Sequence, residues 1–208
     1  VGRRDRVRHD RWVGDELAAE CVHPSREATG RLDAVRPGPT HHIITTQAHV
    51  DHVGGTKAFP ASAGYASSYT SDTLELEMPI EAYKRFMPDF AGEFDDLAEV
   101  GTRQVTHLID GAAQLTGRIE VLPASGHTPG DVLVLVADAD LCFTGDLCFF
   151  GVTPLAWQGD PQQWAEMLDV VVELADVLVP GHGPVGGEAE VRDLQAYLRA
   201  CVAAQGDP

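Results

Sequence analysis

The chain has 208 residues, 44% of them hydrophobic, and a net charge of −17. It is long enough for one well-buried domain over 1–208, and no apolar run approaches the roughly 18 residues that a membrane span needs. Residues 1–50 carry eight Arg and seven acidic residues, whereas the remainder carries seven basic and 25 acidic residues. A body this acidic argues against nucleic acid as substrate or partner.

The N-terminal residues 1–36 are predicted to form an irregular segment. Residues 1–11 are charged and aperiodic, and the helical character of 13–32 ends before the Pro-Gly-Pro run at 37–39. The segment has no apolar stretch of the kind that a secretory signal needs, so we expect a cytoplasmic protein. The cysteines form no C-x-x-C pair and are expected to be free thiols, at Cys21, Cys142, Cys148 and Cys201.

The elements after residue 40 follow from hydrophobic periodicity and turn residues. Strands are predicted at 43–46, 63–66, 132–136, 141–144 and 177–179, a strand with a turn at 105–111, and a strand pair at 115–123 around residues 117–118. Residues 72–100 are predicted to be a helical insertion that Pro79 and Pro88 break into short helices, and it could serve as a lid or pocket wall. Helices are also predicted at 161–175 and 188–204, and Trp164 falls on the buried face of the first.

The most informative stretch is 46–55, with the sequence T-Q-A-H-V-D-H-V-G-G. It follows a buried strand and places four potential metal ligands within six positions, Gln47, His49, Asp51 and His52. In an extended chain, Gln47, His49 and Asp51 would share one face. A turn at the strand end could then direct His49 and His52 at different metal ions.

Three more candidate ligands follow at wide spacing. They are His127 in S-G-H-T-P-G-D, Asp146 in T-G-D and His182 in P-G-H-G-P. Each lies in a Gly-rich setting after an apolar run. Imidazole and carboxylate groups at strand ends, with glycines that let the backbone approach an ion closely, favour a metal site.

These motifs together resemble the metallo-β-lactamase superfamily of hydrolases. That family's pattern is H-x-H-x-D-H followed by a later His, Asp and His; this chain has Q-x-H-x-D-H, with Gln47 at the first position. The resemblance runs from about residue 43 to 185. It implies an α/β (α+β) fold, the αββα sandwich, here with a shortened or incomplete N-terminal half because no strand pair is evident before 43. An edge left exposed in this way could be covered by a homodimer.

The resemblance also implies two metal sites joined by a shared carboxylate. The first would be Gln47, His49 and His127, the second Asp51, His52 and His182, with Asp146 bridging. Zinc is the expected cofactor, about two ions per chain, with iron or manganese as alternatives. Two such ions can share a hydroxide that acts as nucleophile, and Asp51 is predicted to be catalytic by orienting it and moving a proton. A carboxamide is a weaker zinc ligand than imidazole, so the Gln47 site could be weakly filled.

Aromatic residues after Asp146 suggest an apolar substrate pocket. Phe149, Phe150 and Trp157 are the candidates for its lining. The resemblance implies a zinc-dependent hydrolase of a small-molecule or carrier-bound acyl substrate (a thioester, ester, lactone or amide), closer to the glyoxalase II-like and lactonase-like groups than to β-lactamases. The alternatives are a β-lactamase-type amide hydrolase, a catalytically impaired metal-binding or interaction protein, and a diiron redox enzyme. Substrate choice depends on loops, which the sequence does not resolve.

Overall fold

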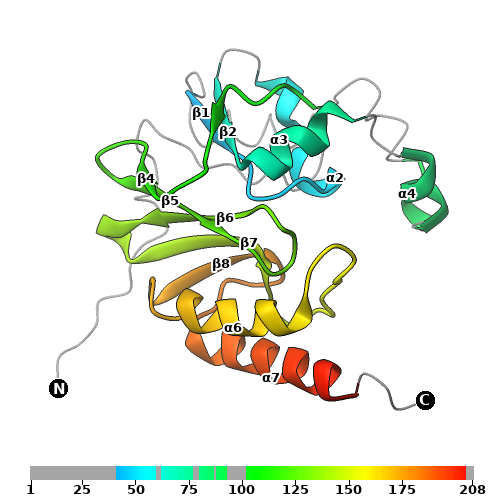
Figure 1. Ribbon diagram of the computed structural model, residues 1–208, viewed down its shortest axis with the longest axis vertical. Helices are drawn as coiled ribbons and strands as arrows, with labels where there is room; N and C mark the ends of the chain where they lie inside the picture. The colour runs from blue at the N-terminus through cyan, green and yellow to red at the C-terminus, as the bar shows by residue number, and fades with distance from the viewer. Residues whose placement is uncertain (1–40, 60–61, 77–79, 87, 93–101, 205–208) are drawn as a thin grey trace.

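The computed structural model describes residues 41–59, 62–76, 80–86, 88–92 and 102–204. They form two sheets with helices on both sides (Figure 1): α2 and α3 lie with a three-stranded sheet on one side of a five-stranded sheet, and α6 and α7 lie on the other. This mixed architecture confirms the predicted α/β class. The predictions for 1–36 and for a shortened N-terminal half concern residues outside the described ones.

The smaller sheet has the order β1-β2-β3 and is parallel throughout. Its strands are β1 (His42–Ile44), β2 (Ala63–Ala66) and β3 (His107–Leu108). The predicted strand at 63–66 is confirmed at both ends. The strand predicted at 43–46 ends at Ile44, and the chain then turns into the first motif.

The larger sheet has the order β4-β5-β6-β7-β8. Its strands are β4 (Ala113–Gln114), β5 (Ile119–Ala124), β6 (Asp131–Val136), β7 (Leu141–Phe149) and β8 (Val177–His182). Neighbouring strands are antiparallel except β7 and β8, which are parallel. Parallel pairing brings the carboxyl ends of β7 and β8 to the same edge of the sheet, where both carry candidate ligands.

The core explains why the apolar run in β6 is continuous. Val132 and Val134 pack with Ile44 and other residues between the two sheets. Leu133 and Leu135 point the opposite way, into a second cluster with α6 and α7. Because successive strand residues alternate between faces, a strand covered on both sides must be apolar throughout.

Helices α6 (Pro161–Val171) and α7 (Glu188–Ala204) cover the outer face of the larger sheet. Asp160 caps α6 by accepting hydrogen bonds from the backbone N–H groups of Gln162 and Gln163. Trp164 is fully buried, as predicted, and its Nε1–H donates to the Leu147 carbonyl over 2.9 Å. The prediction for 188–204 is confirmed, whereas α6 ends at Val171, before the predicted residue 175.

The helical insertion differs in detail from its prediction. It begins with α3 (Ser68–Glu75), four residues before the predicted start, and continues with α4 (Ile80–Phe86) and a short 3-10 helix, η3 (Pro88–Phe90). The early start follows from Ser67, whose hydroxyl accepts a hydrogen bond from the Thr70 backbone. Residues 93–101 lie outside the described part of the chain, so the lid remains a prediction.

Cysteine positions agree with the free thiols expected. Cys142 and Cys148 are buried and unbonded to each other, and Cys201 is exposed and free. Burial raises the pKa of both buried thiols to about 12. Cys21 lies outside the described residues. Among the helices that are described, none is both long and apolar enough to span a membrane.

Candidate metal centre

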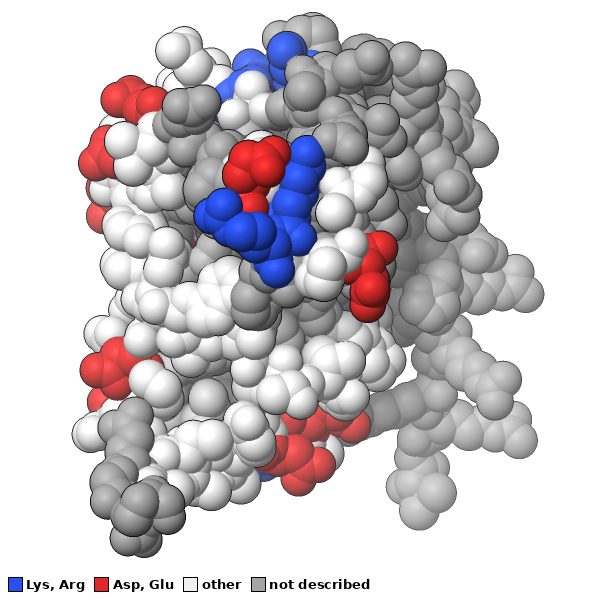
Figure 2. All heavy atoms as spheres, turned by 90° about the vertical axis from the view of Figure 1, so that its right-hand side faces the viewer, with Lys and Arg blue, Asp and Glu red and all other residues white. Residues whose placement is uncertain are grey.

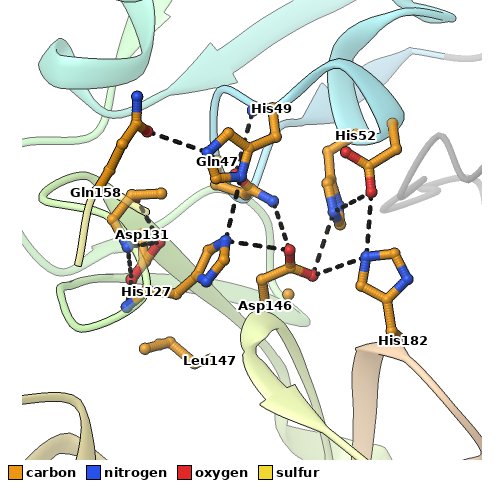
Figure 3. Close-up of polar contacts among 12 residues, drawn as sticks. Gln47, His49, His52, His127, Asp131, Asp146, Leu147, Gln158 and His182 are labelled. Carbon is orange, nitrogen blue, oxygen red and sulfur yellow. Dashed lines mark hydrogen bonds and ion pairs between the residues drawn. The ribbon is translucent and has the colours of Figure 1, made fainter. Parts of the chain in front are cut away.

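The first motif does not continue β1 as an extended strand. After Ile44 the chain bends, and residues Val50–Val53 form one helical turn, α2, with His49 at its N-terminal cap position. The expectation that Gln47, His49 and Asp51 share one extended face is therefore wrong. Because the backbone turns after His49, His49 points to one side of the centre while His52 points to the other (Figure 3). Asp51 belongs to the same group of possible ligands as His52.

The remaining candidate ligands come from one edge of the larger sheet. His127 lies in the loop between β5 and β6, Asp146 in β7, and His182 at the end of β8. The β7–β8 register shifts on both sides of Gly145, whose φ of 52° lies in the left-handed region that favours glycine. Such an irregularity can redirect a side chain beside a site, here Asp146.

Glycine is also required where β8 passes Asp146. A Cβ atom on Gly181 would lie 2.0 Å from Asp146 Oδ1. The Pro-Gly-His motif thus lets the backbone approach the carboxylate while the next residue, His182, reaches the same group.

Two groups of side chains converge on Asp146 (Figure 3). The first contains His49, His127 and Asp146, and the second contains Asp51, His52, Asp146 and His182. Within each group the possible ligand atoms all lie within 4.8 Å of one another. Asp146 belongs to both groups, which gives it the bridging position between two potential ion sites.

The distances show how Asp146 divides its oxygens. Its Oδ2 lies 3.2 Å from His127 Nε2, while its Oδ1 lies 3.2 Å from His52 Nε2 and 3.4 Å from His182 Nε2. In the first group, His127 Nε2 also lies 3.1 Å from His49 Nδ1.

In the second group, Asp51 supplies a further carboxylate. Its Oδ2 lies 3.0 Å from His182 Nε2 and 3.2 Å from His52 Nε2. Its side chain is 45% exposed, unlike that of Asp146, which is buried. Asp51 is therefore the carboxylate of the centre that solvent or a substrate can reach.

Ionisation in the centre suits a cation. Burial alone would raise the pKa of Asp146, but the neighbouring imidazoles of His127 and His52 hold it well below its usual range. Asp51 behaves likewise: burial opposes ionisation, yet the neighbouring imidazoles of His182 and His52 keep its pKa low. Two ionised carboxylates therefore face the imidazoles.

The two outer histidines differ from each other. The hydrogen bond to Asp51 raises the pKa of His182 despite its burial, while burial and the neighbouring His127 lower that of His49. His49 thus favours the neutral form that metal coordination needs.

The donor set fits a metal ion. Imidazole nitrogen and carboxylate oxygen are zinc's usual ligands besides thiolate. Asp146 Oδ1 is buried and has no hydrogen bond within the described structure, although imidazole nitrogens face it. Such an oxygen is costly to bury unless a cation or another strong partner neutralises it.

Gln47 lies beside the centre but is oriented differently from the histidines. It is fully buried, and its Nε2–H donates to Asp146 Oδ2 over 2.9 Å. Its Oε1 accepts a hydrogen bond from the His49 backbone N–H over 3.1 Å.

Two supporting contacts were missed by sequence reasoning. Asp131 accepts hydrogen bonds from the backbone N–H groups of His127 and Thr128 and from the Thr128 hydroxyl, and so fixes the loop that carries His127. Burial raises the pKa of Asp131 to about 6. Gln158 Oε1 lies 3.0 Å from His49 Nε2. The Asp131 contact had a signal, since it closes the S-G-H-T-P-G-D motif; Gln158 had none.

The three predicted pocket residues have different environments. Phe149 stacks on His182, with ring centroids 5.0 Å apart, and is almost fully buried. Trp157 is 51% exposed, with its ring 6.4 Å from that of His49. Phe150 is only 2% exposed and packs in the core, where its ring leaves no room for a Cβ on Gly186. Its prediction as pocket lining is therefore wrong.

Charge on the surface near α4 is mixed. Figure 2 faces the side on which α4 lies, and basic side chains gather there in one small area with acidic side chains beside it. In α4 itself, Lys84 Nζ lies 3.3 Å from Glu81 Oε1. Because this surface carries both signs of charge, it does not test the expectation that the protein binds no nucleic acid, which stays a prediction.

The comparisons with known proteins agree with the geometry of the centre. The family model described as the metallo-beta-lactamase superfamily matches residues 20–182. The chain is 27% identical over 156 residues to metallo-beta-lactamase domain-containing protein 1 of Xenopus laevis, covering 72% of this chain and 57% of that protein. It is 27% identical over 172 residues to the probable metallo-hydrolase YqgX of Bacillus subtilis, covering 75% and 74%.

A hydroxyacylglutathione hydrolase of Shewanella baltica is 28% identical over 141 residues, 65% of this chain and 43% of that enzyme. The chain thus spans about half the length of two of these three relatives.

Solved structures share the fold at low identity. The crystal structure of VMB-1 has a TM-score of 0.70 at 18% identity, covering 91% of this chain and 83% of that one. The metallo-beta-lactamase FIM-1 from Pseudomonas aeruginosa, in its mono-zinc form, has a TM-score of 0.66 at 18% identity, covering 92% and 81%. Because the family model spans most of the chain and the fold agrees with it, this protein belongs to the metallo-beta-lactamase superfamily.

Proposed function

We propose that the chain is a zinc-dependent hydrolase of a small-molecule or carrier-bound acyl compound, such as a thioester, ester, lactone or amide. The observation that carries the proposal is the position of Asp146 between two groups of candidate ligands. The names of two relatives, a probable metallo-hydrolase and a hydroxyacylglutathione hydrolase, support the reaction class.

The side chains would divide between two zinc ions. Asp51, His52, Asp146 and His182 would hold one, and His49 and His127 would hold the other together with Asp146. Zinc, when bound, lowers the pKa of a coordinated water towards about 7 and polarises a carbonyl group. Because a coordinated water would supply the nucleophile, this reaction would need no nucleophilic side chain.

Asp51 is the proposed catalytic residue. Its half-exposed carboxylate stays ionised between His52 and His182, so Oδ2 can accept a hydrogen bond from an attacking water and orient it. Asp146 is buried and more enclosed, which suits a fixed bridging role.

An apolar part of the substrate would lie against the loop after β7. Trp157 is 51% exposed beside His49, and Val152 and Leu155 of the same loop are 48% and 44% exposed. Exposed apolar side chains in a loop that reaches a polar centre, as this one does at Trp157, favour a ligand with an apolar portion. Phe149 supports His182 by ring stacking.

A substrate screen tests the proposal. Zinc-loaded protein is incubated with thioesters, esters, lactones and β-lactams, in parallel with an Asp146→Asn variant. We expect turnover of at least one acyl class and a loss on the order of 100-fold or more in the variant, since the shared carboxylate loses its charge. Asp138→Asn, an exposed residue paired with Arg118, serves as control and should keep full activity. A zinc-loaded protein that hydrolyses none of these compounds would refute the hydrolase.

A further inference from the structure

Gln47 occupies the position where the family pattern has a histidine ligand, yet its side chain is engaged at both ends. Its amide is completely buried and lies between two groups of fixed hydrogen-bonding character. One neighbour is the backbone N–H of His49, which can only donate. The other is Oδ2 of the Asp146 carboxylate, which accepts a hydrogen bond from Gln47 Nε2.

These neighbours fix the orientation of the amide. In the observed arrangement, Oε1 faces the His49 N–H at 3.1 Å and Nε2 faces Asp146 Oδ2 at 2.9 Å. Turning the amide over would place donor against donor and acceptor against acceptor. The only atom of a neutral carboxamide that binds zinc is its oxygen, and this oxygen faces the His49 backbone N–H, whereas the amide nitrogen faces the shared carboxylate of the centre.

The main chain around Gln47 is also held in place. The Thr46 carbonyl accepts a hydrogen bond from the Val132 backbone N–H over 2.8 Å, which ties the end of β1 to the larger sheet. Gln47 therefore extends into the centre from a fixed backbone. Its side-chain Nε2–H meets Asp146 Oδ2, the oxygen that faces the first group of ligands (His49, His127 and Asp146).

We propose that Gln47 is a positioning residue that orients the shared carboxylate of Asp146, and that it is not a metal ligand. The cluster of His49, His127 and Asp146 is then left with two imidazoles and one shared carboxylate. The cluster with His52 and His182 has two imidazoles and two carboxylates, one of them the shared Asp146. Zinc accordingly binds more tightly to the second group, Asp51, His52, Asp146 and His182, and occupies it before the first group is filled. The proposal rests on metal binding at this centre and is independent of the substrate.

The two roles predict different effects of Gln47→Met, which keeps the volume but removes the amide. If Gln47 were a zinc ligand of the first group, its loss would weaken only the weaker of the two zinc-binding steps. A residue that positions Asp146 affects both steps, because Asp146 serves both clusters. We expect the tighter step to weaken by roughly 10-fold or more, measured by zinc competition with a chromophoric chelator.

A matched control is available in Gln195. This glutamine is also buried, and its Nε2–H donates to the Ala165 carbonyl between α6 and α7. Gln195→Met should lower thermal stability without changing either zinc-binding step. An unchanged tighter step in Gln47→Met would overturn the positioning role, whereas wild-type protein that binds no zinc would overturn the proposed function itself.

A crystal structure of zinc-loaded wild-type protein gives a second test that does not depend on the variant folding. We expect Gln47 Nε2 to remain at hydrogen-bond distance from Asp146 with both ions present. An Oε1–zinc bond of about 2.0–2.2 Å would contradict the proposal.

Discussion

His49 is held on its outer side by a residue far away in the sequence. Its Nδ1 faces His127, whereas its Nε2 lies 3.0 Å from Gln158 Oε1. An amide oxygen can only accept, so Nε2 carries the proton and Nδ1 keeps its lone pair for an ion. The loop is firmly seated, because a Cβ on Gly159 would lie 2.0 Å from the Gly126 carbonyl oxygen.

Removing the Gln158 contact should weaken zinc binding by the first group of ligands (His49, His127 and Asp146). Since the hydrogen bond is exposed, we expect Gln158→Ala to reduce the affinity of the weaker zinc-binding step, at the group that contains His49, by roughly 2- to 10-fold. The tighter step should be unchanged. Gln158→Glu keeps an acceptor and should retain the affinity. The control is Gln162→Ala, an exposed glutamine whose side-chain Nε2–H donates to Glu166 Oε1, away from the centre. Equal affinities in Gln158→Ala and wild type would show that the contact does not orient His49.

Residue identity was the part of the centre most open to prediction. The H-x-D-H run and the separate His127, Asp146 and His182 motifs carry ligand-type side chains in recognisable Gly-rich settings. Their partners were not predictable in the same way. Gln158 approaches His49 across 109 positions of sequence, and the direction of the Gln47 amide depends on what faces each end of it.

At the level of elements, the centre depends on how closely β8 passes β7. Gly181 leaves just enough room for Asp146, with an added Cβ only 2.0 Å from its Oδ1. The parallel pairing of the two strands fixes this approach, because it aligns Gly145 with Pro180 and Phe149 with His182.

Gly181→Ala should therefore displace Asp146. We expect a loss of stability of about 1–3 kcal/mol from overpacking, measured by urea denaturation, together with weaker binding of both zinc ions. Gly117→Ala, at a turn where a Cβ meets nothing within 4 Å, is the matched control and should change neither quantity appreciably. If Gly181→Ala retains wild-type zinc affinity, the close approach is not needed for the metal centre.

Element boundaries were predictable where local signals define them. The helix at 188–204 and the strand at 63–66 have the bounds that were predicted, since periodicity and flanking glycines or polar residues agree there. The start of α3 was missed although its signal is local, the capping hydroxyl of Ser67. The same hydroxyl donates to the Gly130 carbonyl, a contact between distant segments that the sequence did not indicate. The helical turn at 50–53 was missed because alternating ligands resemble a strand.

In the whole molecule, the centre joins the two sheets. The segment after β1 supplies His49, Asp51 and His52, and the larger sheet supplies His127, Asp146 and His182. A bound ion would therefore link the two halves of the core. The aggregate acidity of the chain does not interfere with such binding, since the ionised carboxylates of the centre favour a cation.

The most direct test of the account is the zinc content per chain, measured by plasma mass spectrometry after dialysis against zinc and removal of the excess. We predict between one and two zinc ions in wild-type protein, with the second more easily removed, and a clear reduction in Asp146→Asn. Protein that retains no zinc after this treatment, or an Asp146→Asn variant with the wild-type content, would contradict a metal centre organised around Asp146.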